Sequence, residues 1–123
     1  MCLWLQNALN NIKITMSANF NDEILNKHQQ KILSRCARKM TGSRLDLKCF
    51  AILSGLSMAE IDQCLYDSEN LKETWFDIFM RICRKNTRDA QHNLTFIHEN
   101  LKEVELSYIL DEVMSALNFA LIE

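Results

Sequence analysis

Residues 47–73 read LKCFAILSGLSMAEIDQCLYDSENLKE, and this stretch decides the fold class because it carries several helix-end signals close together. Gly55 is placed to end one helix, since glycine adopts a left-handed C-terminal cap without strain. Ser57 and Glu60 form an S-x-x-E capping box that opens a short second helix. Helices with ends this sharp and this close predict a compact helical bundle.

The same signals predict helices on both sides of this stretch, each with apolar residues three or four positions apart. The first four expected helices are 22–40 (ended by Gly42), Ser43 to Gly55, 57–66 and 70–85 (capped by Ser68 or Asn70). A fifth, capped by Thr87, carries apolar residues from Ala90 to Leu101, and the last, opened by Asn100 with Glu103, carries apolar residues from Leu106 to Leu121. A further helix is expected over residues 2–16.

Composition supports one all-helical domain. The chain has 123 residues, no proline and only 2 glycines, which disfavours the tight turns of a β protein. We therefore expect an all-α, six-helix antiparallel bundle over residues 21–123, preceded by a helical N-terminal extension over residues 1–20. Short connections favour antiparallel neighbours in such a bundle.

The cysteines and the apolar runs predict a reduced, cytoplasmic protein. The five cysteines are an odd number, and Cys36, Cys49 and Cys83 fall on apolar helical faces, where we expect small buried side chains. The sequence shows no basic leader and no apolar run of membrane-spanning length. We expect no membrane contact and no disulfide framework.

The sequence shows no motif typical of a catalytic, metal or cofactor site, so a non-enzymatic protein is predicted. Its three histidines lack zinc-ligand spacing, and no C-x-x-C or glycine-rich phosphate loop is present. We expect His28 to be half-buried in the core, and Trp75 with Phe79 to be core residues rather than cofactor contacts. Trp4 either packs on the bundle or anchors a partner.

Charges are segregated although the net charge is only −2. The basic surface is defined as Lys31, Arg35, Arg38, Lys39 and Arg44, and the acidic surface as Glu60, Asp62, Asp67 and Glu69. Such clusters either arise by chance on a solvated surface or dock on other molecules by charge complementarity. A nucleic-acid-binding or transcription-regulatory domain using residues 27–44 is the alternative. It is disfavoured because the next helix is mainly apolar and the C-terminal third is acidic.

The segment from about residue 26 to residue 117 resembles a death domain. The family pattern has an apolar-rich second helix, a turn of a small residue, an apolar residue and Ser, and a short third helix with Ile-Asp. After a further turn, Leu-x-Glu begins a fourth helix that carries a stripe of bulky apolar side chains. The matching residues here are Phe50-Ala51, Gly55-Leu56-Ser57, Glu60-Ile61-Asp62, Leu71-Lys72-Glu73 and Ile78 to Cys83. The death-effector and caspase-recruitment domains share the fold. An Arg-x-Asp-Leu at residues 44–47 matches a death-effector motif but opens the second helix instead of lying near the last.

This resemblance implies a non-enzymatic adaptor or regulator that binds death-fold domains of other proteins, or of its own kind, in apoptotic or innate-immune signalling. The basic and acidic surfaces would then be its partner-binding sites, and no cofactor or nucleic acid would be needed. Asymmetric docking of one patch on another propagates into rings or helical assemblies.

Overall fold

The structure is a computed structural model that describes residues 18–86 and 89–117, with side chains described from residue 27 onward. Over these residues the chain forms six helices and no strand. The helices are α2 (Ala18–Lys39), α3 (Arg44–Leu53), α4 (Met58–Asp67), α5 (Leu71–Lys85), α6 (Ala90–Glu103) and α7 (Ser107–Ala116). The all-helical prediction is confirmed for this part of the chain. The expected helix at 2–16 and Trp4 lie outside the described residues.

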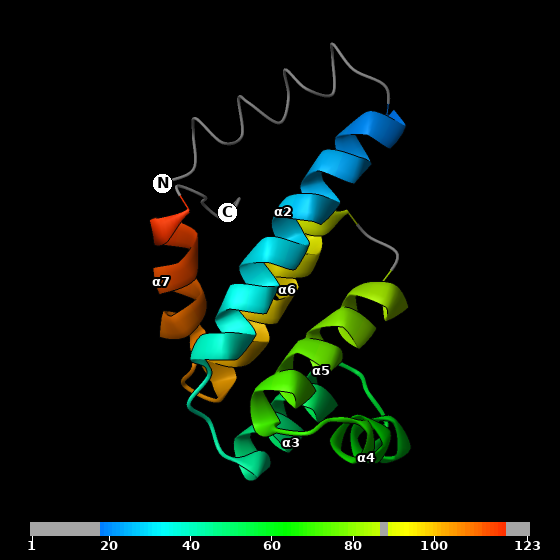
Figure 1. Ribbon diagram of the computed structural model, residues 1–123, viewed down its shortest axis with the longest axis vertical. Coiled ribbons are helices and arrows are strands. Elements are labelled where there is room, and N and C mark those ends of the chain that lie inside the picture. The colour runs from blue at the N-terminus through cyan, green and yellow to red at the C-terminus, as the bar shows by residue number, and fades with distance from the viewer. Residues whose placement is uncertain (1–17, 87–88, 118–123) are drawn as a thin grey trace.

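The long helix α2 is the centre of the bundle. It packs against α5, α6 and α7, whereas α3 and α4 lie together at the end of the bundle where α2 finishes (Figure 1). The helices α5 and α7 run antiparallel to α2, and α6 runs alongside α2 in the same direction (Figure 1). The helix α4 packs on α5 and α3, and the backbone of α2 does not approach that of α3 or α4 in the described region.

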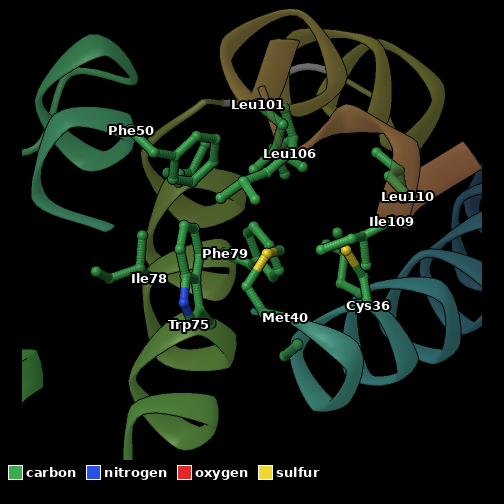
Figure 2. Packing of buried hydrophobic residues seen from close by; sticks show 14 of the residues in the cluster. Cys36, Met40, Phe50, Trp75, Ile78, Phe79, Leu101, Leu106, Ile109 and Leu110 are labelled. Atoms are coloured by element: carbon green, nitrogen blue, oxygen red, sulfur yellow. The ribbon is translucent and has the colours of Figure 1, made fainter. Parts of the chain in front are cut away.

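The core is a single apolar cluster to which every described helix contributes. Its largest members are Phe50, Trp75 and Phe79, all fully buried, whose rings meet at centroid distances of 5.5–5.8 Å (Figure 2). The tilted and edge-on arrangement of these rings is the geometry that aromatic pairs prefer. These three rings join α3 to α5, and Cys36 near the end of α2 and Met40 just after it belong to the same cluster.

Side-chain caps set the starts of three helices as the sequence predicts. Ser57 and Glu60 form both bonds of a capping box at α4, and Ser43 with Asp46 forms a second complete box at α3. Asn70, rather than Ser68, caps α5. Gly55 ends α3 with φ +95°, a conformation that favours glycine.

The boundary between the last two helices differs from the prediction. Asn100 and Glu103 lie inside α6 instead of opening the last helix. The helix α6 ends with Glu105 in the left-handed region, and the Leu106 amide donates to the Leu101 carbonyl at 2.9 Å. This pattern of backbone bonds closes a helix without a glycine. At the other end of α6 the capping side chain is that of Asp89.

Three further expectations are wrong. His28 and Cys49, predicted on covered apolar faces, are both exposed. For Cys49 the reason is that α3 has apolar residues on both faces, and the core covers the face that carries Leu47 and Phe50. Gly42 does not cap α2, which ends at Lys39. It lies instead against the core, where an added Cβ would meet Leu106 Cδ1 at 2.7 Å.

Candidate protein-interaction surface

The basic surface lies along one exposed side of α2 and continues onto α3. Lys31, Arg35, Arg38 and Lys39 are exposed on α2, and Arg44 is exposed at the first position of α3. Spacings of three and four residues place the four α2 side chains on one helical face. Arg38 and Lys39 also occupy the last turn of α2, where positive charge is favourable beside the helix carbonyls.

The acidic surface lies on α4 and the loop that follows it. Asp62, Asp67 and Glu69 are exposed, and Asp67 accepts two hydrogen bonds from Gln63 Nε2 at 2.9 and 3.0 Å. These three carboxylates face solvent at one edge of the bundle and remain accessible to a cationic partner.

Glu60 differs from the other acidic residues because its carboxylate is used inside the molecule. Its Oε1 accepts from Lys85 Nζ at 2.7 Å and from the Ser57 amide at 3.0 Å. The hydrogen bond from Lys85, followed by that from the Ser57 amide, lowers the pKa of Glu60 to about 2. Lys85 Nζ also donates to the Gly55 carbonyl, so this bond ties the end of α5 to the α3–α4 turn. Glu60 therefore stabilises the fold locally and is the least available member of the acidic surface.

The two charged surfaces do not neutralise each other within one molecule. Apart from Arg44 on α3 and Glu69 in the loop after α4, their residues belong to α2 and α4, which do not pack on each other in the described part of the chain. Among the described residues, no ion pair joins one surface to the other. Both surfaces therefore remain available for a second molecule, and their opposite signs are complementary.

A shallow groove runs between α2 and the start of α5, next to the basic surface. It encloses ≈ 350 Å³ and is lined by Ser34, Ala37, Arg38, Asn70, Lys72, Glu73 and Phe76. Ala37 and the half-buried Phe76 give it an apolar lining, while Arg38 and Lys72 place positive charge at its rim. The sequence interpretation missed this groove because its walls come from two helices far apart in the chain.

Tyr66 on α4 is also absent from the predicted sites. It is 86% exposed, the highest value among the large apolar side chains of the described residues. Met58, Asp62 and Tyr66 follow one another at intervals of four residues on the outer face of α4. The same spacing, opposite the buried Ile61 and Cys64, could have revealed this exposed stripe from the sequence.

Several thiols and imidazoles of the described residues are either buried or paired with a carboxylate. Burial raises the pKa of the Cys36 and Cys83 thiols to about 12, which keeps them protonated. His98 Nε2 pairs with Asp111 Oδ1 at 2.8 Å, joining α6 to α7. Over these same residues no group of three or more His, Cys, Asp or Glu side chains is placed to hold a metal ion.

No protein-family model, no curated protein and no solved structure matches this chain. Among the described helices, none combines the length and the apolar character that crossing a membrane requires.

Proposed function

We propose that this protein is a non-enzymatic interaction module of death-domain type, which assembles with other death-fold domains and with copies of itself. The observation that carries the proposal is that the exposed basic side chains of α2 and the exposed acidic side chains of α4 lie on two helices that do not pack on each other. A basic patch that meets an acidic patch on the next molecule forms a heterologous contact, and such contacts build rings or filaments.

The described helices support this proposal in a second way. The described residues form six helices joined by short connections, and side-chain caps begin α3, α4 and α5, which is compatible with a six-helix module of this kind. A role as adaptor or regulator in apoptotic or innate-immune signalling, in the cytoplasm, follows from the same resemblance and is part of the proposal.

A charge-swap experiment tests this function. Asp62→Arg and Arg35→Asp should each weaken self-association, because each places like charges across the contact. A mixture of the two variants should recover association, because the arginine introduced at position 62 would face the aspartate introduced at position 35. Lys102→Glu, an exposed charge reversal on α6, is the matched control and should associate like the wild type.

Sedimentation velocity at several salt concentrations measures these effects. One exposed ion pair is worth only about 0.2–1 kcal/mol, so the assembly needs several such pairs and should weaken as salt is raised. If both single variants associate like the wild type at low salt, the charged surfaces are not the contact. If the wild type instead binds random DNA with a steep salt dependence, residues 27–44 bind nucleic acid and the alternative function, a nucleic-acid-binding domain, holds.

A further inference from the structure

The groove between α2 and α5 has the features of a socket for one large side chain. Its volume of ≈ 350 Å³ leaves room for one large side chain, and the groove is open to solvent on its outer side. Ala37 and Phe76 provide apolar contact, and Arg38 and Lys72 add positive charge at the edge. An occupant of this socket should therefore combine an aromatic or aliphatic group with nearby negative charge.

Glu73 at the groove reduces the positive charge of the rim but leaves it positive, because two cations, Arg38 and Lys72, stand against this one carboxylate. Its Oε2 accepts from the Glu69 amide at 3.0 Å, and its own amide donates to Asn70 Oδ1 at 3.0 Å. The carboxylate is thus held at the amide-rich start of α5, where negative charge is already favourable. No ion pair among the described residues engages Arg38 or Lys72.

Tyr66 has the chemistry that this socket requires. Its side chain is 86% exposed, and three exposed carboxylates, Asp62, Asp67 and Glu69, lie within four residues of it along the chain. An exposed tyrosine offers a large contact area with few rotatable bonds, which is why tyrosine is common at the energetic centres of protein interfaces. In this position the acidic side chains would meet the basic rim as the ring enters the groove.

We propose that the groove receives Tyr66 of a second copy of this chain, with Asp62, Asp67 and Glu69 of that copy set against Arg38 and Lys72. This inference rests on the proposed function and identifies Tyr66 as the side chain that inserts at the contact and the groove as the site that receives it. Tyr66 does not fill the groove of its own molecule, because its side chain is exposed and is not among the residues that line the groove. We choose a second copy as the occupant because the chain itself carries an exposed aromatic ring and acidic side chains that match the apolar lining and the basic rim of the groove.

Two substitutions that change no charge separate this contact from general electrostatic attraction. Tyr66→Ala removes the anchor, and Ser34→Phe fills the groove from α2 while leaving Tyr66 in place. Each should lower the self-association constant by about tenfold or more, as loss of an interface anchor does. Tyr66→Phe keeps the ring and Tyr108→Ala removes an exposed tyrosine elsewhere, so both should stay within about twofold of the wild type.

A mixing experiment tests whether anchor and groove are partners. Tyr66→Ala retains an open groove and Ser34→Phe retains the tyrosine, so an equal mixture should form mixed pairs more strongly than either variant associates alone. Thermal melts of all variants control for folding, and Ser34→Leu replaces Ser34→Phe if the latter lowers the melting temperature. As a direct readout, unlabelled wild type should shift the Ala37 methyl resonance of labelled Tyr66→Ala protein, and unlabelled Tyr66→Ala should not.

Three results would overturn the inference. If Tyr66→Ala associates like the wild type while Asp62→Arg does not, the charged surfaces act without this anchor and only the proposed function survives. If the mixture of the two variants does not recover association, Tyr66 and the groove are not in contact. A wild type that stays monomeric at low salt would exclude a second copy as the occupant, and pull-down of a different death-fold partner would then separate this failure from failure of the proposed function.

Discussion

Replacing Trp75 tests the core and one unusual polar group within it. The side chain is fully buried, and its ring lies 5.5 Å from that of Phe50 and 5.8 Å from that of Phe79. Its Nε1 is buried with no hydrogen-bond partner among the described residues. An unsatisfied buried donor costs about 1–3 kcal/mol, so part of what tryptophan contributes by packing is offset by this N–H group.

Two substitutions at this site should therefore differ more in their effect on the free energy of unfolding than the sizes of the new side chains suggest. Trp75→Ala should lower the free energy of unfolding by about 3–5 kcal/mol, the usual range for removing a buried tryptophan. Trp75→Phe leaves a smaller void and also removes the unpaired N–H, so we expect a loss below about 1.5 kcal/mol. Phe79→Leu is the matched control, because it shortens a buried aromatic side chain without removing a polar group, and it should cost about 1 kcal/mol more than Trp75→Phe.

Urea unfolding followed by circular dichroism measures these differences, and equal m values would show that the unfolded states remain comparable. If Trp75→Phe costs as much as Phe79→Leu, the indole N–H has a partner in solution and the reasoning about it is refuted. A loss below about 1 kcal/mol for Trp75→Ala would contradict the position of α5 in the core.

Three further predictions concern single residues. Gly42→Ala should destabilise the fold by about 1–3 kcal/mol in thermal melts, because the new Cβ would lie 2.7 Å from a core methyl group, and an unchanged melt would contradict this packing. Since the pKa of Glu60 is lowered to about 2 from 4.5, its contribution to stability should be complete above about pH 4.5 and lost as the pH falls toward 2; Lys85→Met should raise the Glu60 pKa in an NMR titration. Iodoacetamide should modify exposed Cys49 before Cys36, whose pKa burial raises to about 12, and peptide mapping that finds the reverse order would contradict the burial.

The sequence predicted those helix ends that depend on local side-chain caps. The bonds of Ser57 with Glu60 and of Asn70 with Glu73 join residues three positions apart, so the sequence pattern contains all the information needed. The end of α6 depends instead on the left-handed backbone of Glu105, and glutamate is not a usual signal for that conformation.

Features that depend on tertiary contacts were harder to predict. Asn100, expected to open a helix, donates from Nδ2 to Ser54 Oγ across the bundle at 3.1 Å. The apolar residues on both faces of α3 could not show which face would be covered, so Cys49 was placed wrongly. The charges of the basic surface could be predicted from residue spacing, but the groove could not, because α2 and α5 meet only after folding.

The central position of α2 has a consequence for how the protein is made. A nascent chain leaves the ribosome from its N-terminus, so α2 emerges early while its packing partners α5, α6 and α7 are still being translated. During that interval Leu33 and Cys36, both completely covered in the folded protein, have no native neighbours to cover them. Completion of the fold must therefore wait until α7 has been synthesised, and until then the apolar side of α2 is exposed to chaperones and to aggregation with other nascent chains.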